Sequence, residues 1–232
     1  MYPNKFWKIE FTELINNKKN FITKLALPLI LMSPLVIPEI PFNIKASIFT
    51  LIIIFISTFS SAVSLTQLKE SKIIERIAML PISDHKFIFE YIIASSFIDF
   101  IKFVIPFTLL LVFNLKNFQL LTFFWVLITF IISIIFANCL GIIVALLANT
   151  AAEVHLYSII MVLGISFISG IFFNSFPFFL SFLPFLTPFH YLLKSILFYE
   201  NGILIASIYP LVIITITFLV VTLISSRLFR FD

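Results

Sequence analysis

The 232-residue chain is 61% hydrophobic and only 11% charged, and it has four glycines. A water-soluble globule needs more polar surface than this composition supplies, which excludes that class. The long apolar runs favour membrane-spanning helices over a strand barrel, whose segments alternate and are separated by many turn residues. The net charge of +4 is attributed to membrane topology and contact with anionic lipid, and it does not point to nucleic acid.

The first polar segment, about residues 4–19, predicts an amphipathic helix that lies in the membrane interface. Trp7, Phe11, Leu14 and Ile15 recur at helical spacing, and polar residues fill the other faces. The alternative is a charged anchor for the first span.

Six transmembrane helices are predicted, because each needs about 20 apolar residues. Their approximate ranges are 21–37, 46–67, 87–113, 118–148, 154–173 and 203–226. The second range carries small hydroxyl residues in its later half, which favours close helix approach and hydrogen bonds between helices. The chain is therefore expected to form a single all-α transmembrane domain.

The basic residues predict the orientation of these helices. Eleven of the 15 lysines and arginines lie at the start of the chain, between the second and third spans, or after the sixth span. Because bases are retained on the cytoplasmic side, a multi-pass protein of the cell membrane with both termini in the cytoplasm is predicted.

Two opposite charges lie inside the third predicted span. Asp99 and Lys102 are three residues apart, so they share one helix face and can neutralise each other. Each alone would cost about 2.5–3.5 kcal/mol at mid-membrane. Two interpretations stay open, namely a polar patch on a transport path or gate and a structural pair inside the bundle.

Catalytic and metal-binding motifs are absent from the sequence. The spacing of the four glycines excludes the phosphate-binding G-x-x-x-x-G-K-[ST] loop, and the three histidines are isolated. No catalytic residue and no metal ligand is therefore assigned. An intramembrane serine protease that pairs Ser166 or Ser169 with His190 is an alternative, although the G-x-S-G arrangement of such proteases is missing.

The connection between the second and third spans concentrates charge around one proline. Ile73, Ile74, Ile77 and Leu80 fall at helical spacing, and Pro81 ends the pattern. This predicts a short amphipathic helix, a hard turn and then the third span. Such an element can lie on lipid, or it can enter a groove on a soluble partner.

Two stretches resemble permeases of the type-2 (ABC2-type) family of ABC exporters. The stretch ERIAMLPISDHKFIFEYI resembles the family's cytoplasmic coupling loop, here residues 68–86. The stretch FISGIFFNSFPFFLSFLPFLTPFHYLL resembles the end of the family's fifth span and a re-entrant outer hairpin, here residues 174–200. The resemblance extends over nearly the whole chain in the order of its elements.

The resemblance implies the membrane permease subunit of an ATP-driven exporter of an amphipathic or lipid-like substrate. ATP and Mg²⁺ would be bound by a separate nucleotide-binding subunit, with no cofactor on this chain. The permease would be a homodimer, or a heterodimer with a related permease, in contact with membrane lipid and not with nucleic acid. The alternative is a non-transporting membrane assembly protein that docks a soluble partner through residues 70–90.

Two sets of residues take their expected roles from this resemblance. The residues expected to couple to the ATP-binding subunit are Glu70, Ile73, Ile74, Glu75, Arg76, Ile77, Leu80 and Pro81. The residues expected at the outer gate and in the hairpin are Gly170, Phe172, Phe173, Pro177, Pro184 and Pro188.

Overall fold

The computed structural model describes residues 26, 28–37, 39–70, 84–113, 120–148, 150–172, 180–200 and 209–228. The regular structure of these residues is helical throughout. The predicted interface helix lies outside the described residues, as do residues 71–83 of the coupling loop and residues 173–179 of the outer hairpin.

Four helices among the described residues are long and apolar enough to cross a membrane. They are α3 (Phe42–Glu70), α5 (Asp84–Phe113), α6 (Leu120–Leu147) and α7 (Ala151–Ile168). The 29 residues of α3 extend about 43 Å at 1.5 Å per residue, whereas the hydrocarbon core of a bilayer is about 30 Å thick. The prediction of an all-helical membrane protein is thus confirmed, while the number of six spans stays a prediction.

Residues 28–31 are also helical, and four further elements lie within the described part of the chain. They are the 3₁₀ helices η1 (Ser33–Val36) and η3 (Leu183–Leu186) and the helices α8 (Pro188–Glu200) and α9 (Tyr209–Leu228). Helix α8 begins at a proline, which is favourable at a first helical position because no intrahelical bond needs its missing N–H. The second half of the predicted hairpin is therefore mostly helical.

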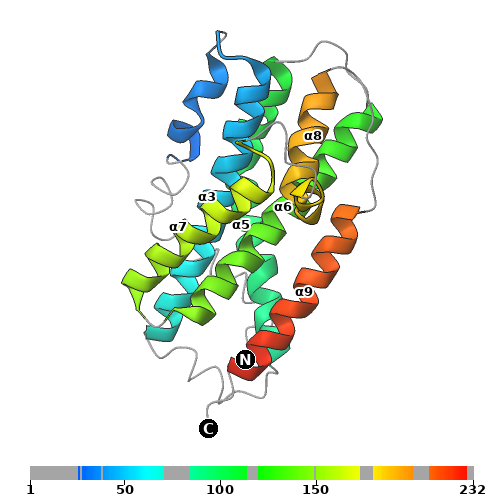
Figure 1. Ribbon diagram of the computed structural model, residues 1–232. Helices are drawn as coiled ribbons and strands as arrows, with labels where there is room; N and C mark the ends of the chain where they lie inside the picture. Colours follow the sequence, from blue (N-terminus) through cyan, green and yellow to red (C-terminus); the bar gives the residue numbers. More distant parts are fainter. Residues whose placement is uncertain are drawn as a thin grey trace, which may run out of the picture.

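Helix α6 is the centre of the bundle and packs against α3, α5, α7, α8 and α9. Figure 1 shows α3 and α6 descending and α5 rising, and α5 packs against both. Helix α7 starts beside the lower end of α6 and stops near mid-height, where α8 begins and continues toward the upper end (Figure 1). Helix α9 descends to the end at which α3 finishes and α5 starts (Figure 1).

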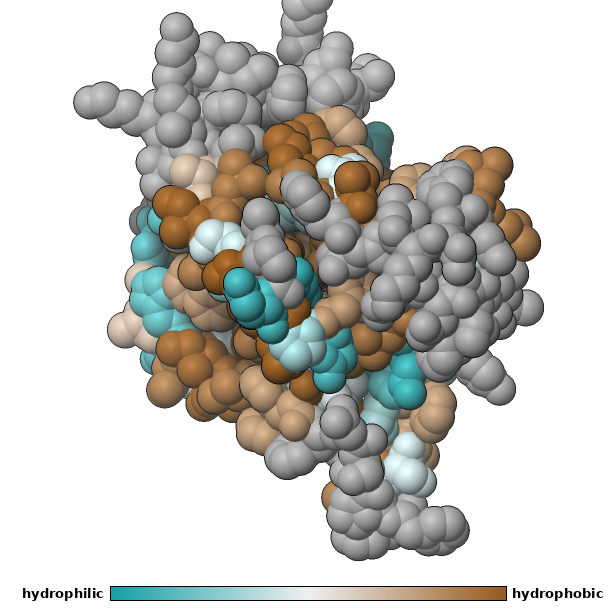
Figure 2. Space-filling view, turned by 90° about the horizontal axis from the view of Figure 1, so that it is seen from above, coloured by the Kyte–Doolittle hydropathy of each residue, from teal (hydrophilic) through white to brown (hydrophobic). Residues whose placement is uncertain are grey.

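Aromatic stacking fills the core between α3, α5 and α6. The rings of Phe107 and Phe130 lie 4.3 Å apart with planes inclined by only 4°, and the ring of Phe49 lies 5.8 Å from Phe107. All three side chains are buried. Seen from the end at which α3 begins, the described surface shows hydrophobic residues around a smaller group of hydrophilic ones (Figure 2).

Both ends of α7 are set by local hydrogen bonds. The side chain of Thr150 accepts a hydrogen bond from the backbone N–H of Glu153 at 3.3 Å, which caps the first turn. At the other end Gly170 has φ of 75°, and the N–H groups of Gly170 and Ile171 bond to the carbonyls of Phe167 and Ser166. These two bonds form a Schellman motif. The helix therefore starts before residue 154 and ends before residue 173, the limits expected from hydropathy.

Candidate functional site in the helix bundle

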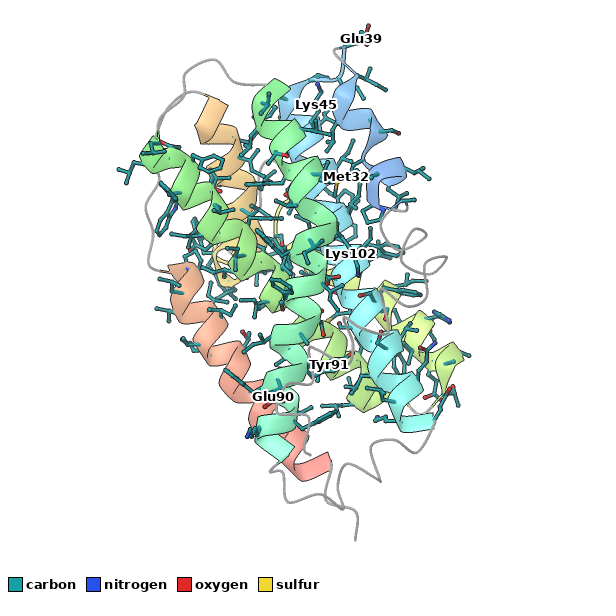
Figure 3. The ribbon with its side chains drawn as sticks, turned by 180° about the vertical axis from the view of Figure 1, so that it is seen from behind. Met32, Glu39, Lys45, Glu90, Tyr91 and Lys102 are labelled. Carbon is teal, nitrogen blue, oxygen red and sulfur yellow. The ribbon has the colours of Figure 1, made fainter. Side chains whose placement is uncertain are left out.

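A buried ion pair lies near the middle of α5. The Nζ atom of Lys102 lies 2.6 Å from Oδ1 of Asp99, and the two residues are 7% and 1% exposed. Figure 3 shows Lys102 far from both ends of the bundle, with Glu39 and Lys45 near one end and Glu90 toward the other. The pairing expected from the spacing of three residues is therefore confirmed, and each charge is neutralised within α5.

Asn138 connects this ion pair to α6. Its Nδ2 atom donates to Oδ2 of Asp99 at 3.1 Å and to the carbonyl of Ile134 at 3.0 Å. Its Oδ1 atom is buried without a hydrogen-bond partner. Pro106 lies one turn further along α5, and it has no N–H to donate to the carbonyl of Lys102 four residues earlier. Together these groups make a polar cluster between α5 and α6.

The contact between α3 and α6 is unusually close. Thr58 donates from Oγ1 to the carbonyl of Ala137 at 3.2 Å, which confirms the hydrogen bonding expected from the hydroxyl-rich half of this span. Gly141 allows the approach, because a Cβ atom at this position would lie 1.8 Å from Oγ of Ser61 and 2.4 Å from the carbonyl oxygen of Thr58. Only a glycine fits without moving one of the helices.

Two further hydrogen bonds link α3 to α5 and to α6, toward the end where residues 71–83 connect α3 to α5. The hydroxyl of Tyr91 on α5 donates to the carbonyl of Ser61 on α3 at 2.9 Å. The Nζ atom of Lys69 in the last turn of α3 donates to the carbonyl of Ala145 near the end of α6. That carbonyl belongs to the group of four that an α-helix leaves unpaired at its C-terminus. Helices α3, α5 and α6 are thus linked from the polar cluster to this end.

A second polar group closes the break between α7 and α8. Thr187 donates from Oγ1 to Oγ of Ser169 at 2.9 Å, and Oγ of Ser169 donates to the carbonyl of Ile165 at 2.6 Å. The Nδ1 atom of His190 lies 3.3 Å from the carbonyl oxygen of Ser169. Non-helical backbone at membrane depth requires such internal partners.

This geometry does not support the serine-protease alternative. The His190 ring nitrogen contacts the backbone of Ser169 and not its hydroxyl, whose proton goes to Ile165. The Oγ atom of Ser166 is buried with no hydrogen-bond partner. Neither hydroxyl is therefore activated by the imidazole.

The other predicted site residues fall into three groups. Glu70 is the exposed last residue of α3, and the remaining coupling residues lie outside the described part of the chain. Gly170 ends α7, and the exposed Phe172 packs its ring 5.1 Å from that of Phe167. Pro184 and Pro188 are buried in η3 and at the start of α8, whereas Phe173 and Pro177 are not described.

Sequence reasoning missed Asn138, Gly141 and Tyr91. Their signal was present, because Asn138 and Gly141 are isolated polar and small residues in the most hydrophobic of the candidate spans. A side-chain amide in such a run must find a partner inside the bundle.

The comparisons with known proteins agree with this architecture. A family model described as ABC-2 family transporter protein matches residues 12–225 of the 232-residue chain. A search of curated proteins found no match. The match spans the helices α3 to α8 and all but the last turn of α9. A multi-pass helical bundle with this match over most of its length belongs to the ABC-2 family of transporter proteins.

Proposed function

We propose that this chain is the membrane permease of an ATP-driven exporter and that a separate nucleotide-binding subunit docks on residues 70–82. The cargo is amphipathic or lipid-like, in keeping with an apolar bundle. The cytoplasmic side is the end at which α3 and α9 finish, because the basic connections predict that orientation. ATP and Mg²⁺ bind to the partner subunit.

The observation that carries this proposal is the set of hydrogen bonds linking α3, α5 and α6. Residues 71–83 connect the end of α3 to the start of α5, so a force on that connection acts on both helices. The bonds of Tyr91 to Ser61 and of Lys69 to Ala145 tie the same region to its neighbours. A displacement of the connection therefore moves these helices together as a unit, which is what a coupling element requires.

A second copy of the chain, or a related permease, completes the transport path in this proposal. Helix α7 is the least covered of the four candidate spans, with 22% of its apolar window buried compared with 56–78% for the others. Two such helices facing each other would line a central path between the subunits. The Gly170 end of α7 and the exposed Phe172 would then stand at the outer limit of that path.

The proposed cycle follows from differential binding. Closure of two nucleotide-binding subunits around ATP favours one arrangement of residues 70–82, and hydrolysis removes that preference. The helix pair α3 and α5 moves with this connection, and α6 follows through its bonds to both. The outer end then opens past Phe172 and the following hairpin.

The test is co-purification followed by an ATPase assay in proteoliposomes. The intact chain is expected to retain a nucleotide-binding subunit and to show vanadate-sensitive ATP hydrolysis. Ile77→Asp and Glu75→Lys are expected to abolish both the association and the transport. Survival of association and transport in both variants would exclude residues 70–82 as the docking element.

Glu39→Lys is the matched control. Glu39 lies near the opposite end of the bundle (Figure 3), so its charge reversal should leave subunit association unchanged. Association without ATP-driven transport in the unmodified protein would favour the non-transporting assembly protein that docks a partner through residues 70–90.

A further inference from the structure

An apolar groove of about 830 Å³ runs between α5, α6 and α9. This volume lies within the range of about 300–1,000 Å³ that is typical of small-molecule sites. The buried side chains of Ile92, Ser96 and Ile134 form its floor, and the exposed side chains of Phe89, Ile93 and Phe97 form its open edge. The groove is therefore open sideways, away from the buried core.

We infer that this groove binds one acyl chain of an anionic phospholipid whose headgroup lies against Lys86. The groove is lined almost entirely by hydrocarbon and opens on the flank of membrane-spanning helices. Water is a poor occupant of an apolar cavity because it finds no hydrogen-bond partners there. The bilayer supplies hydrocarbon at this position, so a lipid chain is the occupant whose chemistry fits.

The length of the groove matches a chain that enters from one membrane surface. Its lining follows α5 from Phe89 to Phe100, a distance of about 16 Å at 1.5 Å per residue. Phe89 lies near the start of α5, and Phe100 lies beside the ion pair of Asp99 and Lys102. A lipid tail would therefore enter at the end of the bundle and stop at the level of the polar cluster.

Charge favours an anionic headgroup at the entrance. Lys86 is exposed and precedes Phe89, Ile93 and Phe97 at intervals of three and four residues, so all four share one face of α5. The stem of a lysine can lie along apolar surface while its ammonium group reaches the headgroup region. In the orientation proposed above, this entrance lies in the cytoplasmic leaflet, where anionic lipids are concentrated.

Photo-crosslinking tests this inference on the full-length protein in lipid nanodiscs. The probes are phosphatidylglycerol and phosphatidylcholine that carry the same acyl chain with a terminal diazirine, each at a low mole fraction in phosphatidylcholine. Peptide mapping is expected to place crosslinks in residues 89–100 and 131–135, with several-fold more from phosphatidylglycerol. Even labelling of all lipid-facing helices would overturn the inference, since it would indicate bulk bilayer contact only.

Two variants fill the groove from different sides. Ile93→Trp adds volume at the exposed edge, and Ser96→Leu adds it at the floor, where the Oγ atom of Ser96 has no hydrogen-bond partner. Both are expected to lower labelling several-fold at unchanged protein monodispersity. Ile160→Trp, on the exposed face of α7, is the matched control and should leave labelling unchanged. Unchanged labelling in both filling variants would overturn the inference.

The headgroup is tested separately. Lys86→Gln should remove the preference for phosphatidylglycerol, whereas Glu90→Gln, one helical turn away, should preserve or increase it. Equal labelling by the two lipids in the unmodified protein would overturn the headgroup assignment. Disulfide formation between two copies of an Ile93→Cys variant would overturn the lipid assignment, because it would place a second chain on the groove. None of these readouts depends on transport.

Discussion

Asn138 on α6 donates a 3.1 Å hydrogen bond to Asp99 on α5, and this bond joins two membrane helices at an ion pair. The acceptor carboxylate is also held by Lys102 at 2.6 Å. A charge in this position is tolerated because every part of the arrangement is internal to the bundle. The stability of the protein should therefore depend on the presence of both charges, or on the absence of both.

The first prediction concerns the ion pair of Asp99 and Lys102. Lys102→Met leaves the Asp99 carboxylate buried and uncompensated, and it should lower the free energy of unfolding by about 3–5 kcal/mol. The double variant Asp99→Asn with Lys102→Met should recover most of that loss, because neither charge remains. Thermal unfolding of purified proteins in one detergent measures both. Additive losses in the double variant would show that the residues do not act as a pair.

The second prediction concerns the close approach of α3 and α6. Gly141→Ala should destabilise the protein by about 1–3 kcal/mol through overpacking, since its Cβ atom would meet Ser61 and the Thr58 backbone. Gly164→Ala is the matched control, because nothing lies within 4 Å of a Cβ atom there. It should instead stabilise α7 by up to about 1 kcal/mol.

Adding Ser61→Ala to Gly141→Ala should restore part of the loss, since it removes the nearer of the two clashes. Thermal unfolding again provides the measurement. Equal changes in unfolding temperature for Gly141→Ala and Gly164→Ala would contradict the close approach of α3 and α6 at Gly141.

The third prediction concerns the end of α7. Gly170→Ala forces a residue with a Cβ atom into the left-handed conformation, which should cost about 1–2 kcal/mol. Gly170→Asn should cost less, because asparagine adopts this conformation more readily at helix ends. The unfolding temperatures should therefore fall in the order glycine, asparagine, alanine. A reversed order of the two variants would argue against the Schellman motif.

The fourth prediction separates two nearby serines. Ser169→Ala removes the hydroxyl that accepts from Thr187 and donates to Ile165, and it should cost about 1 kcal/mol. Ser166→Ala removes a buried hydroxyl without a partner, so stability should stay unchanged or increase. Unfolding temperature and ATP-driven transport are measured for both variants. A loss of activity in Ser166→Ala at an unchanged unfolding temperature would favour the serine-protease alternative.

Hydropathy placed the long helices well because their sequence runs are much longer than a soluble helix requires. It placed the ends of α7 less well, since these depend on individual hydrogen bonds at Thr150 and Gly170. The pattern Thr-x-x-Glu at Thr150 to Glu153 was a readable capping signal. Composition alone treated those residues as a loop.

The candidate site was only partly predictable. The pairing of Asp99 with Lys102 follows from their spacing on one helix, which is local information. The contacts of Asn138 with Asp99 and of Tyr91 with Ser61 depend on how separate helices rotate against each other, and periodicity does not determine this in a helix that is apolar on all sides. The sequence does identify these residues as unusual, but it does not specify their partners.

The shortness of α7 has a consequence for the surrounding bilayer. Its 18 residues extend about 27 Å, slightly less than an average hydrocarbon thickness of about 30 Å. Because α7 stops near mid-height of the bundle (Figure 1), its Gly170 end lies within the membrane and is held by hydrogen bonds to Thr187 and His190. The bilayer therefore does not have to thin to cover α7, and the activity of this protein should depend little on the chain length of its host lipids.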